Sequence, residues 1–157
     1  MLNRLINLLL MMALLGACKN EVLQTAEDNA ISSYLAKQVD VPPATNSGLY
    51  FFRAKMGNGK LTKVGDQLRF QINIRLLTVT LDGEFKSVLS TYPNNPDSCV
   101  LGTDNRPAFL AEALSLMHQG DSVKLVVPSS LAYGIHQTGS VPPYTPLLVT
   151  MELLEIK

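Results

Sequence analysis

The chain reads VPSSLAYG at Val127–Gly134, VPP at Val141–Pro143 and LLVTMELL at Leu147–Leu154. Apolar residues in the last of these runs recur at every second position, which is typical of a strand with one buried face. The Pro-Pro pair indicates a turn, and Tyr133 stands among apolar neighbours. Together these runs predict an apolar pocket that contains a single hydroxyl group.

The same alternation with period two is clearest further upstream, at residues 67–76. Its apolar members are Leu68, Phe70, Ile72, Ile74 and Leu76. Asp82-Gly83 follows as a hairpin-turn signal, because glycine tolerates a positive φ there, and residues 85–89 are the expected return strand. Residues 122–127 alternate in the same way. These segments predict an antiparallel sheet with one covered face.

A single helix is predicted between these strands, over Pro107 to Gln119. Its apolar face consists of Leu110, Ala113, Leu114 and Met117, which recur at helical spacing. We expect Asp104 or Asn105 to cap the start of this helix and Gly120 to end it. One short helix packed on one curved antiparallel sheet belongs to the α+β class.

The N-terminus has the pattern of a bacterial lipoprotein signal peptide. Arg4 supplies a positive charge, residues 6–15 are almost uniformly apolar, and small residues precede Cys18. The apolar run is shorter than the roughly 20 residues of a transmembrane helix. We therefore predict a signal peptide at residues 1–17 and a lipid anchor on Cys18. A secretory signal that happens to precede a cysteine is the alternative.

Residues 18–48 are predicted to hold the anchor, a helix and a linker, and residues 49–157 the folded domain. The apolar face of this first helix consists of Leu23, Ala30, Ile31, Tyr34 and Leu35. Two interpretations of the helix stand. It is either a spacer that packs its short apolar stripe on the domain, or a helix that binds a partner or a second copy.

Composition and charge argue against several kinds of chemistry. The 13 basic and 13 acidic residues balance to a net charge of zero, without the clustered Lys and Arg that phosphate binding requires. His118 and His136 are the only histidines, and neither belongs to a spaced ligand cluster. We therefore expect no metal, no cofactor and no nucleic-acid partner. His136 is either a residue at the pocket rim or a solvated loop residue.

Residues 65–157 resemble the FKBP-type peptidyl-prolyl cis-trans isomerases, most clearly from Gly120 onward. That family typically has Pro-Pro-x-Leu-Ala-Tyr-Gly, then Ile-Pro-Pro, then a last strand that ends in Glu-Leu-Leu. The signal, the cysteine, the helix and Ser47–Tyr50 are also similar to those of its membrane-anchored lipoprotein members in Gram-negative bacteria. The resemblance implies a curved antiparallel sheet wrapped around one short helix, with a proline pocket between them.

The same resemblance implies where the protein acts and on what. It indicates a protein of the cell envelope, lipid-anchored at the outer membrane and facing the periplasm. Its partners would be that membrane and proline-containing polypeptide substrates. Its activity would be the isomerisation of the peptide bonds that precede proline, in support of the folding of envelope proteins.

Individual residues take roles from the resemblance. Tyr133 matches the tyrosine whose hydroxyl donates to the substrate carbonyl, so it is the expected catalytic residue. Substrate-binding positions are implied at Leu76, Phe85, Leu110, Val141 and Val149. From the residues alone, Tyr133 has a second interpretation, as a core tyrosine whose hydroxyl bonds a nearby backbone carbonyl.

Four positions depart from the family pattern. Leu76 stands where the family usually has a tyrosine, and Lys86 where it usually has an aspartate. Leu110 stands where a tryptophan is usual, although Phe109 is adjacent. Pro107 falls where a backbone N–H holds the ligand, and proline has no such donor. Because these changes keep the pocket apolar but remove polar groups, the alternative to an isomerase is a non-catalytic, FKBP-like module that binds peptides as a chaperone.

Overall fold

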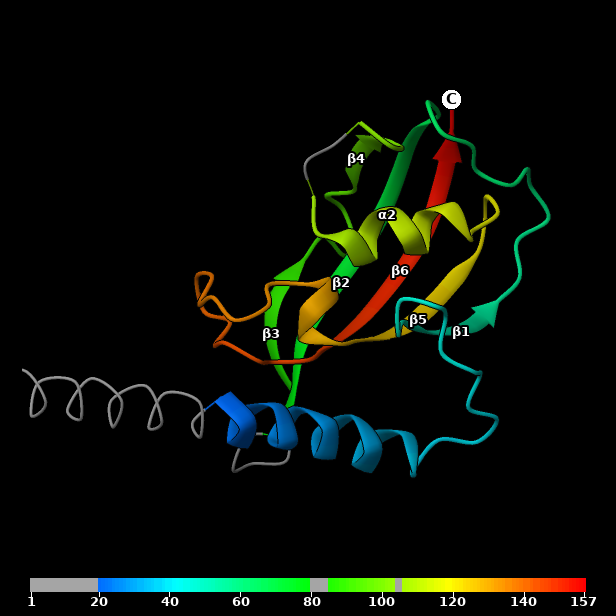
Figure 1. Cartoon of the computed structure of the whole chain (residues 1–157). Coiled ribbons are helices and arrows are strands. Elements are labelled where there is room, and N and C mark those ends of the chain that lie inside the picture. Colours follow the sequence, from blue (N-terminus) through cyan, green and yellow to red (C-terminus); the bar gives the residue numbers. More distant parts are fainter. Residues whose placement is uncertain (1–19, 80–84, 104–105) are drawn as a thin grey trace, which may run out of the picture.

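The computed structural model describes residues 20–79, 85–103 and 106–157 (Figure 1). Residues 20–35 are helical and form the N-terminal helix. The other elements are β1 (Tyr50–Lys55), β2 (Gln67–Val79), β3 (Phe85–Ser90), β4 (Asp97–Val100), α2 (Ala108–Ser115), β5 (Ser122–Val127), the 3₁₀ turn η1 (Ser129–Leu131) and β6 (Leu147–Ile156). The predicted signal peptide, Cys18 and the turn at Asp82-Gly83 lie outside the described residues. In the part that is described, no helix has the length and apolar character needed to cross a bilayer.

The six strands form one antiparallel sheet in the order β1-β5-β6-β2-β3, and β4 also pairs with β2. The long strand β2 pairs along one edge with β6. Along its other edge it pairs first with β4 and then with β3. The strands predicted at residues 67–76, 122–127 and 147–154 are therefore confirmed as β2, β5 and β6.

Apolar pairs across β2 and β6 stabilise the centre of the sheet. Phe70 is paired with Leu153, Ile72 with Met151 and Ile74 with Val149. Directly opposed apolar side chains of this kind each stabilise an antiparallel pair by roughly 0.2–1 kcal/mol. The alternation in the sequence thus fixes both the register and the face that is buried.

The helix α2 is shorter than the sequence predicts, ending at Ser115 rather than Gln119. After Ser115 the chain turns to pair with the segment before β2. Thr62 donates its N–H to Met117 O, and Gln119 donates to Lys60 O. Pro107 is the N-cap, and no side chain of a described residue caps the helix there. The predicted caps Asp104 and Asn105 lie outside the described residues.

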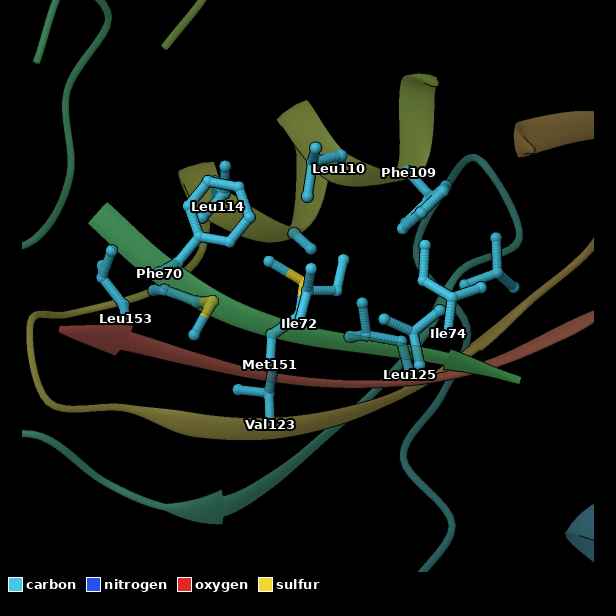
Figure 2. Packing of buried hydrophobic residues seen from close by; sticks show 14 of the residues in the cluster. Phe70, Ile72, Ile74, Phe109, Leu110, Leu114, Val123, Leu125, Met151 and Leu153 are labelled. Atoms are coloured by element: carbon cyan, nitrogen blue, oxygen red, sulfur yellow. The ribbon is translucent and has the colours of Figure 1, made fainter. Parts of the chain in front are cut away.

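We call the face of the sheet that α2 covers the inner face. It carries the main core. Figure 2 shows Phe109, Leu110 and Leu114 of α2 above the side chains of three strands. Those strand residues include Phe70, Ile72, Ile74, Val123, Leu125, Met151 and Leu153, all buried. A continuous apolar layer of this kind is what holds one helix on one sheet.

The opposite, outer face carries a second apolar cluster beneath the N-terminal helix. Ile31 of that helix and Leu77, Val126 and Leu148 of the sheet form its buried part. Tyr34, Leu35, Tyr50, Phe52 and Phe85 pack around it. In Figure 1 this helix lies below the strands, whereas α2 crosses in front of β2 and β6. The α+β architecture, with a sheet around one short helix and a further helix ahead of it, is therefore confirmed.

Candidate functional site

A cavity of about 230 Å³ opens on the inner face, between β2 and the start of α2. Its lining consists of Phe70, Ile72, Ile74, Leu89, Asp97, Arg106, Pro107, Phe109, Leu110 and Tyr133. The volume lies below the range of roughly 300–1,000 Å³ that is usual for small-molecule sites. It suits a single side chain or ring of a bound peptide better than a large cofactor.

One side of the cavity is apolar and consists of residues from β2 and α2. Phe70, Ile72 and Ile74 lie on the inner side of β2, where alternate residues share a face. Phe109 and Leu110 face them from the first turn of α2 (Figure 2). All five side chains are at most 5% exposed, so this part of the cavity excludes water from anything that enters it.

Tyr133 is the tyrosine among the residues that line this cavity. It follows η1 in the loop between β5 and β6, it is half-buried, and it packs against the inner core. Across residues 20–79, 85–103 and 106–157, its hydroxyl makes no hydrogen bond. The interpretation of Tyr133 as a core residue bonded to a backbone carbonyl therefore has no support in the described part of the chain.

A charged pair forms another part of the wall. Arg106 donates from Nη1 to Asp97 Oδ2 at 2.5 Å and from Nη2 to Asp97 Oδ1 at 3.1 Å. The guanidinium also donates to Ser98 O at 3.0 Å and lies over the Phe70 ring, 5.9 Å from its centroid. These hydrogen bonds from Arg106 hold the pKa of Asp97 below its usual value, against the opposing effect of burial. The pair is a fixed polar feature beside an otherwise apolar cavity.

The structure brings two of the predicted site residues together at the cavity, Tyr133 and Leu110. Leu76, Val141 and Val149 belong to the same inner core, at 5%, 1% and 0% exposure, but none of them lines the cavity. Pro107 lines the cavity, directly before α2, and Lys86 is exposed on β3.

Phe85 lies elsewhere, on the outer face of the sheet. Its ring meets Tyr34 of the N-terminal helix edge-on, with the centroids 6.0 Å apart. The Arg75 guanidinium lies 5.9 Å from its centroid. Because the N-terminal helix offers this aromatic contact, Phe85 packs in the outer cluster and contributes nothing to the cavity wall.

Several lining residues were not assigned a site role from the sequence. The alternation of β2 predicts that Phe70, Ile72 and Ile74 are buried, but not that they border a cavity. Asp97 and Arg106 belong to no motif in the sequence, and only their hydrogen bonds in the folded chain reveal them. Phe109 stands next to Leu110, and the structure shows that both line the cavity.

Comparison with known proteins agrees with this architecture. Residues 59–154 match the family described as FKBP-type peptidyl-prolyl cis-trans isomerase. The macrophage infectivity potentiator of Trypanosoma cruzi is 33% identical over 115 residues, covering 71% of this chain and 54% of that protein. The FKBP-type 22 kDa peptidyl-prolyl cis-trans isomerase of Escherichia coli is 34% identical over 115 residues, covering 72% and 52% respectively. The chain thus spans about half the length of these two relatives.

Solved structures show the same fold. The crystal structure of FkpA from Escherichia coli matches with a TM-score of 0.68 at 24% identity, covering 96% of this chain and 70% of that one. A peptidyl-prolyl cis-trans isomerase from Pseudomonas syringae matches with a TM-score of 0.68 at 23% identity, covering 87% and 95%. Both matches confirm the fold that the sequence resemblance implies.

Proposed function

The chain belongs to the FKBP-type peptidyl-prolyl cis-trans isomerase family, and from this premise we propose that it isomerises peptide bonds before proline in the cavity beside Tyr133. The proposal depends chiefly on one observation. An apolar cavity of about 230 Å³ contains a tyrosine whose hydroxyl makes no hydrogen bond within the described residues. Such a hydroxyl is available to a bound peptide.

The reaction requires stabilisation of a twisted amide rather than acid–base chemistry. Rotation about a peptide bond is opposed by a barrier of roughly 18–20 kcal/mol, which comes from amide resonance. Before proline the two isomers differ by only about 0.5–1 kcal/mol, yet they exchange over tens of seconds or more. A catalyst must therefore bind the twisted form better than either planar form.

The cavity has two features suited to this task. Phe70, Ile72 and Leu110 provide an apolar lining for the proline ring. Water stabilises the polar, planar amide, so a lining that excludes water favours the twisted form. Tyr133 can then donate a hydrogen bond to the carbonyl oxygen in its twisted position. No proton leaves the tyrosine and no covalent bond forms.

Replacement of the Tyr133 hydroxyl tests this proposal. In Tyr133→Phe we expect kcat/KM on X-Pro peptides to fall by about threefold to tenfold, because one neutral hydrogen bond to the twisted amide is lost. A protease-coupled assay on the domain without its first 18 residues measures the rate. Tyr144→Phe is the matched control, because Tyr144 lies in the same inter-strand loop but does not line the cavity. An unchanged rate in Tyr133→Phe removes the assigned role, and a wild-type rate equal to background rejects the isomerase.

A non-catalytic peptide-binding module is the second candidate. Pro107 favours it, because this lining residue offers no N–H to a ligand. Lys86, the charged residue that replaces an aspartate, is exposed on β3 and does not line the cavity. Suppression of aggregation of an unfolded client without any isomerase rate is the result that favours this second function.

Anchoring to the cell envelope is part of the proposal. Residues 1–17 would be removed as a signal peptide, Cys18 would carry the lipid, and residues 18–48 would join it to the domain at 49–157. The anchored domain would face the periplasm from the outer membrane and act on folding envelope proteins. More than one acyl chain on a residue gives durable anchoring. On cell fractionation we expect the full chain in the membrane fraction, with a mass that includes lipid on Cys18, and Cys18→Ser in the soluble fraction. Equal distribution of the two proteins between the fractions would contradict the anchor.

A further inference from the structure

A buried carboxylate joins the N-terminal helix to the loop that carries Tyr133. Glu27 is only 3% exposed, although its neighbours on the helix are largely open to solvent. Its Oε1 accepts a hydrogen bond from the Ser129 backbone N–H at 2.5 Å, and its Oε2 accepts one from the Ser129 hydroxyl at 2.7 Å. Burial of a carboxylate is unfavourable unless it is hydrogen-bonded. This contact satisfies both oxygens through one residue, 102 positions away in the chain.

Ser129 in turn fixes the backbone on both sides of Tyr133. Its carbonyl oxygen accepts hydrogen bonds from Ala132 N at 2.9 Å and from Gly134 N at 2.7 Å. Ala132 has an unusual backbone conformation, with φ −108° and ψ −99°, and Gly134 has a φ of +63°, which favours glycine. Tyr133 therefore stands between two residues that are both tied to the same carbonyl.

An apolar contact supports the same arrangement. Ile31 lies one helical turn after Glu27 and shares its face of the helix. Ile31 packs with Val126 and Leu148 in the outer cluster. Val126 is in β5, whose last residue is followed directly by Pro128 and Ser129. The helix thus contacts both the end of β5 and the loop that continues from it.

We infer that Glu27 is a positioning residue, which acts through Ser129 to hold the Tyr133 loop in its conformation at the cavity. The N-terminal helix is then a working part of the site and not only a spacer. The kinetic consequence rests on the proposed isomerase function, but the structural consequence does not. Two separate measurements can therefore test it.

The first measurement is amide hydrogen exchange in the Tyr133 loop. In Glu27→Ala we expect the Ala132 and Gly134 amides to exchange at least about tenfold faster, because their acceptor is no longer held in place. Amides of β2 and β6 keep their wild-type exchange. Asp28→Ala is the matched control, because it removes an acid from the same helix. Asp28 is exposed, and its side chain accepts a hydrogen bond from Gln24 of that helix.

The second measurement separates kcat from KM on X-Pro peptides. Glu27→Ala should lower kcat by about threefold to tenfold and change KM by less than about twofold, because a misplaced Tyr133 weakens the twisted state while the apolar lining remains. Glu27→Gln should restore most of kcat, since an amide can accept from the Ser129 N–H and donate to its hydroxyl.

The outcomes divide clearly. Unchanged exchange at Ala132 and Gly134 in Glu27→Ala overturns the inference, and so does faster exchange that spreads equally through β5 and β6, which would indicate a general structural role. If the wild-type chain has no isomerase rate, the proposed function fails, while the exchange data alone still decide whether Glu27 positions the loop.

Discussion

The two faces of the sheet are covered by helices in different ways. On the outer face, Ile31, Tyr34 and Leu35 of the N-terminal helix pack directly on strand residues, and Phe85 joins them. On the inner face, α2 covers the core but leaves the cavity beside Tyr133. Hollows of about 370 and 620 Å³ also border the N-terminal helix on the outer face. The two faces therefore differ in what lines their openings, because the inner cavity has Tyr133 in its wall and the outer hollows do not.

Element lengths account for part of this difference. The helix α2 has eight residues, which at 1.5 Å per residue span about 12 Å. Strand β2 has 13 residues, which at 3.3 Å per residue span about 43 Å. A helix so short cannot cover the whole inner side of β2. Binding sites arise where a well-packed layer ends, and here that end lies beside Pro107.

Neighbouring leucines in β6 allow the two faces to be compared directly. Leu147 is in the inner core and Leu148 is in the outer cluster, at 0% and 2% exposure. We expect Leu147→Ala to lower the free energy of unfolding by about 3–4 kcal/mol and Leu148→Ala by about 2–3 kcal/mol, because the outer cluster is smaller. Urea denaturation followed by circular dichroism measures both values.

Amide exchange in the N-terminal helix distinguishes these two variants further. Leu148→Ala should speed exchange in residues 20–35, because Leu148 packs with Ile31, and Leu147→Ala should not. If both variants loosen the helix equally, the two faces are not independent layers and the comparison fails.

Much of the fold could be predicted from the sequence, because the relevant signals are local and periodic. Alternation at residues 67–76, 122–127 and 147–154 predicted strands that the structure contains. The end of α2 could not be predicted, because residues after Ser115 leave the helix to pair with residues 60–62. That competition depends on contacts between segments far apart in the chain.

The candidate site was less accessible from the sequence. Tyr133 and Leu110 could be found through the family motif, and the structure places both at the cavity. Asp97 and Arg106 carry no recognisable motif, because a charged pair nine positions apart gains meaning only when the chain folds. The placement of Phe85 depends on the N-terminal helix, which the motif does not include.

Two truncations of similar kind test which face binds peptide. Leu110→Ala removes part of the cavity wall, so we expect KM for an X-Pro peptide to rise by about tenfold through lost apolar contact. Phe85→Ala removes a larger side chain from the outer face and should change KM by less than about twofold. The assays are carried out at a temperature at which circular dichroism shows that both variants are folded.

A rise in KM for Phe85→Ala that equals the rise for Leu110→Ala would mean that the outer face takes part in peptide binding. An unchanged KM in Leu110→Ala would mean that the cavity does not hold the proline ring. Either result reverses the functional contrast between the faces.

The smallest expected effect concerns the charged pair at the cavity. Arg106 holds the pKa of Asp97 below its usual value through two hydrogen bonds. A carboxyl with a lowered folded-state pKa stabilises the protein above its unfolded pKa of about 3.9, and this contribution is lost as the pH falls through the folded value. We therefore expect Asp97→Asn to reduce the free energy of unfolding between about pH 5 and 7, where the unfolded carboxyl is also ionised, and the difference from wild type to shrink below about pH 4.

The magnitude should not exceed about 1 kcal/mol, because both side chains are roughly one-third exposed and solvent screens the pair. Glu155→Gln is the control, since the Arg69–Glu155 pair on the sheet is longer, at 3.5 Å, and more exposed. We expect no measurable change in that variant at any of these pH values. Protonation of Asp97 at low pH breaks the ion pair in the wild type as well, so a difference in stability that comes from the pair must then vanish. If Asp97→Asn stays less stable than wild type in acid by the same amount, the asparagine disturbs packing at the cavity.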